Sequence, residues 1–142
     1  MVESGISDIL LTYNIIGQLK LDHLVALAHR ADLKVVADSA EVVEGLSAAM
    51  SRAGLTLPVL VECDTGAHRC AVATPAEAAA LAQMIDRANG LAFRGLVTYP
   101  PKAPWPRPMH GWLRPWIYAR APVLQSRSSA MAERLISTAP MR

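Results

Sequence analysis

The chain has 142 residues, a net charge of +2, and 52% hydrophobic against 18% charged residues, which suits one globular domain and excludes a disordered chain. Its apolar runs fall short of the ~20 residues that cross a bilayer, so we expect no membrane contact. The first seven residues lack the basic start and apolar stretch of a secretory signal, and two cysteines in such a chain indicate reduced thiols. We therefore expect a cytoplasmic protein.

Charge and composition change sharply along the chain. Residues 1–102 contain eight Lys/Arg and eleven Asp/Glu, whereas residues 103–142 contain six Arg, no Lys and one acid. The second region also holds all three Trp and six of the ten Pro. This break predicts a folded region over residues 1–102 and an irregular tail over residues 103–142.

The folded region begins with a strand, a helix and a second strand. Residues 8–12 are a short apolar run and predict the first strand. Residues 19–31 place Leu, Val and Ala at helical spacing, and residues 34–38 predict the second strand. A second helix follows over residues 38–54, with the capping box and the C-terminal glycine that mark helix ends (Asp38, Glu41 and Gly54).

The same alternation continues to the end of the region. Residues 58–63 predict a buried third strand, and residues 93–99 predict a fourth. Between them, residues 74–90 predict a helix with its own start and stop signals (Thr74, Pro75, Glu77 and Gly90). Strands alternating with helices indicate an α/β fold of parallel βα repeats. Both a doubly wound open sheet and part of a (β/α)8 barrel fit this pattern.

In both architectures ligands bind at the carboxyl ends of the strands. The candidate positions are therefore the residues that follow each strand, at 13–14, 38–39, 63–69 and 98–101. No strand is followed by G-x-G-x-x-G or G-x-x-x-x-G-K-[ST], which argues against a nucleotide site.

One of these segments, "ECDTGAHRC", carries several metal-ligand side chains (Cys63, Asp64, His68 and Cys70). Zinc ligands usually come in spaced pairs from two elements, and the chain has no second cluster of that kind. We therefore expect no metal site. Cys63 is interpreted as a small core residue near the strand end.

Two residues of the candidate positions suit a ligand. The guanidinium of Arg69 can meet a phenolate, carboxylate or phosphate with a fork of donors. The alternative is a surface arginine paired with Asp64. Tyr99 precedes two prolines, and both a ligand contact and plain packing remain open for its ring.

Four segments, "SGISDILLTYNIIG", "VVADSAEVVEGLS", "VLVECDTGAHRCAV" and "GLVTYPP", together resemble the D-threonine aldolase and D-serine dehydratase group. That group belongs to the alanine-racemase-like, fold-type III enzymes that use pyridoxal phosphate. The resemblance covers residues 1–102 and implies a partial (β/α)8 TIM-barrel segment. It also implies that Arg69 lies beside the cofactor ring and that Tyr99 approaches the cofactor or substrate. The family loop usually has Gly where this chain has Ala71.

The family's cofactor-binding lysine and its C-terminal metal ligands have no counterpart in this chain. The family lysine that binds the cofactor lies on a strand that would precede Met1, and no lysine here is equivalent to it (Lys20, Lys34 and Lys102). The family's C-terminal metal ligands would lie beyond Arg142. We therefore expect no catalytic residue and no activity from this chain alone. The resemblance implies a fragment of a lyase for D-3-hydroxy amino acids, homodimeric when intact.

The composition of the tail has a testable explanation, a shift of reading frame near Lys102. Suitable codons let the shifted frame over residues 128–141 read V-S-N-G-G-T-P-D-I-Y-R-A-H, which resembles the family's phosphate-binding "SNGGTP" segment. Codons incompatible with that reading would remove the idea.

Two other functions compete with the fragment. The tail combines Arg with aromatic residues, as single-stranded nucleic-acid binders do. Its dense proline, lack of Lys and lack of a motif favour an accidental peptide, so we expect no nucleic-acid partner. The other alternative is a small, non-catalytic α/β protein unrelated to the family.

Overall fold

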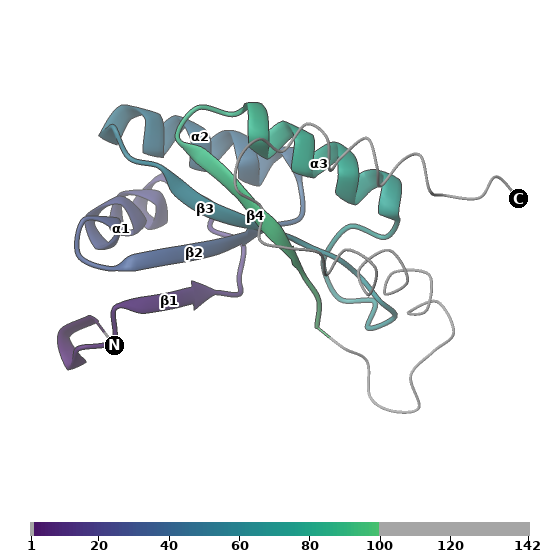
Figure 1. Ribbon diagram of the computed structural model, residues 1–142, viewed down its shortest axis with the longest axis horizontal. Coiled ribbons are helices and arrows are strands. Elements are labelled where there is room, and N and C mark those ends of the chain that lie inside the picture. Colours follow the sequence, from purple (N-terminus) through teal and green to yellow (C-terminus); the bar gives the residue numbers. More distant parts are fainter. Residues whose placement is uncertain (1, 100–142) are drawn as a thin grey trace, which may run out of the picture.

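The structure is a computed structural model that describes residues 2–99. A short 3-10 turn, η1 (Val2–Ser4), precedes four strands and three helices (Figure 1). In chain order these are β1 (Asp8–Leu11), α1 (Gln18–Ala28), β2 (Asp32–Ala37), α2 (Ala40–Ala53), β3 (Leu57–Glu62), α3 (Pro75–Arg87) and β4 (Leu91–Val97). The predicted alternation is thus confirmed, although β4 starts and ends two residues earlier than expected. The tail and its predicted frame shift lie outside the described residues.

All three strand pairs are parallel, and the strands lie side by side in the order β1-β2-β3-β4. A doubly wound sheet needs a point at which the strand order reverses, and this sheet has none among the described strands. Helix α1 packs on α2 and α2 packs on α3, so the helices form one continuous layer. Sequential parallel strands beneath a single helix layer are the arrangement of a barrel segment.

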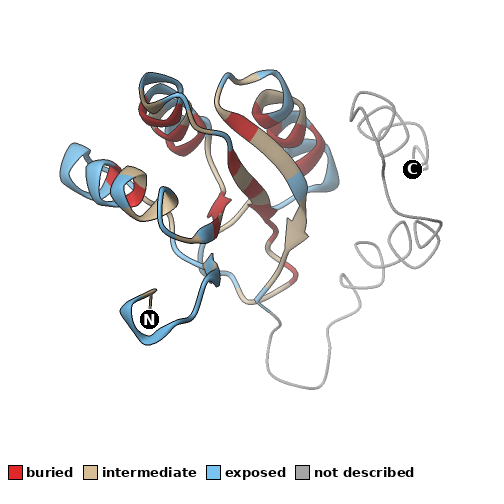
Figure 2. Ribbon diagram, turned by 60° about the vertical axis from the view of Figure 1, so that its left-hand side comes forward, coloured by how far each residue is buried: buried red, intermediate tan, exposed pale blue. Residues whose placement is uncertain are grey.

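The core lies between this helix layer and the sheet. Strand residues of one parity, such as Val35 and Val59, are fully buried against Leu46, Met50 and Ile85 of the helices. Figure 2 marks the buried segments of the strands and helices in red. Each side chain of this size contributes about 1.5–3 kcal/mol when it leaves water. Residues of the other parity face away from the helices. Among the described residues, no helix is both long and apolar enough to cross a membrane.

The two later helices begin differently. In α3 the predicted capping box is confirmed: the Glu77 amide donates to Thr74 Oγ1 at 3.2 Å, and the Thr74 amide donates to Glu77 Oε2 at 2.9 Å. In α2 the predicted capping box is wrong, because the N-cap is Ser39 rather than Asp38. Ser39 makes no side-chain capping hydrogen bond, and the Asp38 carboxylate is left outside the helix.

Two glycines shape the turns at the far end of the helices. Gly54 ends α2 in the left-handed region with φ 65°, as predicted. Helix α3 ends at Arg87, and Gly90 lies in the turn that leads into β4 with φ 75°. A Cβ atom on Gly90 would come within 2.8 Å of the Ser51 amide nitrogen, so the turn packs directly on α2.

Candidate functional site

A loop after β3, here called the rim loop (residues 64–71), stands at the carboxyl ends of the strands. Backbone hydrogen bonds close its base, since the Asp64 amide donates to Val72 O at 2.8 Å and the Val72 amide donates to Glu62 O at 3.0 Å. The Cys63 amide donates to Val97 O at 2.8 Å, which ties the base to β4. The loop is therefore held over the ends of β3 and β4.

The Asp64 carboxylate organises the interior of the rim loop. Its Oδ1 accepts the amides of Gly66 at 2.8 Å and His68 at 3.1 Å, and its Oδ2 lies 3.2 Å from His68 Nδ1. Burial acts to raise the pKa of Asp64, but these amides and the His68 ring outweigh it, so the pKa lies below its usual value. Among residues 2–99 no ion pair joins Asp64 to Arg69, so the pairing in that alternative is wrong, although Arg69 does lie at the surface.

Arg69 instead lies against Tyr99. The Arg69 Cζ atom is 4.3 Å from the centroid of the Tyr99 ring, within the range of a cation–π contact. The contact of its Nη2 with Cys70 Sγ, at 3.9 Å, raises the pKa of Arg69 above its usual value. Tyr99 lies two residues beyond β4 and is 58% exposed, so it is not packed in the core. Arg69 and Tyr99, the two predicted site residues, thus lie in contact at the carboxyl ends of the strands.

A cleft of about 150 Å³ adjoins this pair and reaches the ends of all four strands. Its wall includes Thr12, Val36, Glu62 and Thr98 together with Arg69 and Tyr99. The Thr65 and Thr98 hydroxyls lie 2.7 Å apart, and this hydrogen bond fastens the rim loop to the end of β4. The cleft is therefore lined by aromatic and apolar side chains together with one cation, Arg69, and one carboxylate, Glu62.

The four candidate metal ligands of the sequence do not gather. Cys63 is buried, its Sγ lies 3.8 Å from Val61 O, and burial, followed by the charge of Glu62, raises its pKa to about 12. Asp64 and His68 are occupied with each other. Cys63 and Cys70 are both free thiols, one buried and one exposed.

A different group forms around Cys70. One ligand atom each from Asp38, Glu62 and Cys70 lie within 4.8 Å of one another. Glu62 is the only acid in the apolar β3, and alternation along the strand points it away from the helices. Glu62 was not among the residues predicted from the sequence, although a lone acid in an apolar strand run is a signal that points to it.

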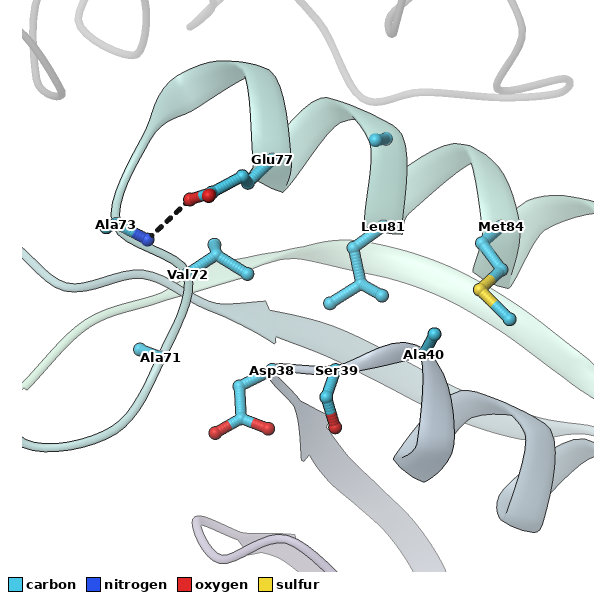
Figure 3. Close-up of a pocket in the computed structure, with 10 residues that line it drawn as sticks. Asp38, Ser39, Ala40, Ala71, Val72, Ala73, Glu77, Leu81 and Met84 are labelled. Atoms are coloured by element: carbon cyan, nitrogen blue, oxygen red, sulfur yellow. Dashed lines mark hydrogen bonds between the residues drawn. The ribbon is translucent and has the colours of Figure 1, made fainter.

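A second, wider hollow of about 520 Å³ lies beside the start of α2 and the first turns of α3 (Figure 3). Its walls are mostly apolar and include Val72, Leu81 and Met84. The Glu77 carboxylate at its edge accepts the Ala73 amide at 2.9 Å. Among the described residues that line it, the acids are this capping carboxylate and Asp38, and these do not form a catalytic set.

The described lysines lie away from the cleft. Lys34 Nζ contacts Asp8 Oδ1 at 2.6 Å and Asp32 Oδ2 at 2.9 Å, at the amino ends of β1 and β2. These two carboxylates raise the pKa of Lys34. Lys20 lies in α1, and Lys102 is outside the described residues.

Comparison with known proteins places this chain in a family. The family model described as "Alanine racemase, N-terminal domain" matches residues 4–117 of the chain. The chain belongs to this family. It is 40% identical over 98 residues to a D-threonine aldolase from Arthrobacter sp, a match that covers 69% of this chain and 26% of that protein. A 3-hydroxy-D-aspartate aldolase from Paracoccus denitrificans is 34% identical over 96 residues, covering 67% of this chain and 25% of that enzyme.

A solved structure agrees with the fold. The crystal structure of D-threonine aldolase from Filomicrobium marinum superposes with a TM-score of 0.66 at 40% identity, over 68% of this chain and 26% of that one. The α/β fold of this family member is therefore the predicted partial TIM barrel, and the open-sheet alternative is wrong. The chain spans about a quarter of the length of these relatives.

Proposed function

We propose that this chain is a segment of a pyridoxal-phosphate-dependent lyase that acts on D-3-hydroxy amino acids. The similarity to two aldolases for such substrates supports the substrate class. The observation that carries the proposal is the contact of Arg69 with Tyr99 beside a cleft at the carboxyl ends of the strands. That end of a barrel is where its active site lies.

The cleft suits the ring of the cofactor. A pyridoxal ring is flat and aromatic, and it carries a phenolate oxygen. The guanidinium fork of Arg69 donates to such an oxygen, and the exposed Tyr99 ring offers a flat apolar surface. Thr98, held by Thr65, fixes the chain at Tyr99 and so keeps the pair in position.

The described residues suit the ring of the cofactor but not its covalent attachment or its phosphate group. Among residues 2–99, no lysine and no glycine-rich phosphate cradle line the cleft, and Lys34 is held at the opposite ends of the strands. In the family the bound cofactor supplies an electron sink for cleavage beside the substrate Cα atom. Arg69 and Tyr99 would orient the ring for that chemistry, and no described residue would perform it.

We further propose that the chain alone is inactive. Purified chain, mixed with pyridoxal phosphate and D-threonine, should release no glycine or acetaldehyde above a protein-free control. The physical reason is that orientation of the ring does not by itself hold the cofactor covalently or move a proton. Release of both products in step with protein concentration would overturn the proposal of inactivity.

A further inference from the structure

We propose that Asp38, Glu62 and Cys70 bind a divalent transition-metal ion of the zinc class. The three side chains come from the end of β2, the end of β3 and the rim loop, and their ligand atoms lie within 4.8 Å of one another. Two carboxylates and a thiolate form a donor set that zinc, cobalt and cadmium accept, whereas the sulfur disfavours magnesium and calcium. The site borders the cleft of Arg69 and Tyr99, since Glu62 lines that cleft and Arg69 Nη2 lies 3.9 Å from Cys70 Sγ, but it uses neither Arg69 nor Tyr99 as a ligand.

The first reason is the burial of Glu62. This residue is 6% exposed, so its carboxylate is largely removed from water. Among residues 2–99, the only hydrogen bond to this carboxylate is from Cys70 Sγ at 3.5 Å, and no Lys, Arg or His forms a salt bridge with it. Arg69 lines the same cleft but forms no salt bridge with Glu62, so this buried carboxylate has no direct cationic partner among the described residues, and a bound cation would supply one.

The second reason is that the Asp38 carboxylate has no hydrogen-bond or ion-pair partner among the described residues. Helix α2 is capped by Ser39, so Asp38 is not used to start the helix. No hydrogen bond or ion pair holds its carboxylate within the described part of the chain. Figure 3 shows the Asp38 carboxylate directed away from Leu81 and Met84 of α3. It is thus available to the ligand group at the rim.

Distance and charge both suit a metal ion. Zinc–oxygen and zinc–sulfur bonds of about 2.0–2.3 Å separate neighbouring ligand atoms by roughly 3.5 Å, so the observed group is slightly wider than a closed site. Cys70 is exposed, and a rotation of its side chain would bring the three ligand atoms closer together. Two carboxylates and a thiolate with a divalent ion carry a net charge of −1, which the neighbouring Arg69 guanidinium balances.

The test uses the full chain, without pyridoxal phosphate, titrated with cobalt(II). We expect saturable binding of one ion with a sulfur-to-cobalt charge-transfer band, which only a thiolate ligand produces. The chain has two cysteines, so Cys70→Ser should abolish the band, whereas Cys63→Ser should retain it. Glu62→Gln should raise the dissociation constant about 10-fold or more.

Controls separate ligation from damage to the fold. Asp38→Asn alters a residue outside the core and should also weaken cobalt binding about 10-fold while far-UV circular dichroism stays unchanged. His68→Ala, in the same loop, should leave the affinity unchanged. The proposal is overturned by absence of the band, by its persistence in Cys70→Ser, or by unchanged affinity in folded Asp38→Asn. Because no cofactor is present, each outcome is independent of the proposed lyase function.

Discussion

Ala71 adopts a backbone conformation that suits glycine. Its φ of 104° lies in a region that side chains with a Cβ rarely enter, and such strain costs about 1–3 kcal/mol. The loop that the sequence resembles usually has Gly at this position, and the positive φ gives a physical reason for that glycine. In this chain the strained residue lies at the end of the rim loop, which also carries Arg69.

Ala71→Gly should therefore stabilise the chain by about 1 kcal/mol, since relief of strain exceeds the entropy cost of glycine. Urea denaturation followed by circular dichroism measures the change. Ala67→Gly, in the same loop but outside the positive-φ positions, is the matched control and should be neutral or destabilising. An unchanged or lower midpoint for Ala71→Gly would contradict the assigned strain.

Asp64 makes stability depend on pH. Its folded-state pKa lies below the unfolded value of about 3.9, so its contribution is complete above that pH and is lost as the pH falls through the folded-state pKa. Asp64→Asn should cost about 1 kcal/mol at pH 7, and the difference from the parent chain should shrink towards pH 3.

Urea midpoints at both pH values measure this effect. Asp86→Asn, at an exposed position of α3, controls for the loss of a charge. A deficit of Asp64→Asn that is the same at pH 7 and pH 3 would show that the ionised carboxylate does not organise the rim loop.

Single-residue predictions from the sequence succeeded where chain order decides the position. Arg69 and Tyr99 follow neighbouring parallel strands, so both had to reach the same rim. Their direct contact, and the position of Glu62 beside Cys70, depend on how the rim loop folds back, which a linear pattern does not reveal. The role of Arg69 and Tyr99 towards a cofactor stays a prediction.

At the scale of elements, the two helix starts provide a matched pair. Thr74 forms a complete capping box, whereas Ser39 accepts no capping hydrogen bond. Thr74→Ala should lower the free energy of unfolding by about 1 kcal/mol, and Ser39→Ala should change it by much less. Denaturant titration of both variants measures the difference, and equal losses would contradict the observed caps.

The strands and helices were predictable because apolar periodicity and glycine or proline signals agree in this chain. The start of α2 was missed by one residue because Asp38 and Ser39 are both good N-caps. The Asp38 to Glu41 spacing favoured the wrong one. The start of β4 was predicted two residues too late: Leu91 and Ala92 are apolar as well, and they pair with Leu57 and Pro58 of β3.

At the scale of the whole molecule, the sequence pattern alone left two architectures open. The unbroken order β1-β2-β3-β4 favours the barrel segment, and it places the four strand ends around one cleft. Periodicity within each strand could not decide this, because open and closed parallel sheets bury the same residues. The order of the strands in the sheet, which is set by pairing between them, distinguishes the two architectures.

We propose above that this segment carries the ring-orienting part of a lyase site. The direct test replaces the matching segment of the Arthrobacter D-threonine aldolase with residues 4–99 of this chain and measures aldolase activity and bound-cofactor absorbance. We predict an active hybrid in which Arg69→Ala lowers kcat/KM by about 10-fold or more, while the exposed α2 substitution Arg52→Ala leaves it unchanged. If Arg69→Ala leaves the activity of a folded, cofactor-loaded hybrid unchanged, Arg69 does not orient the cofactor ring.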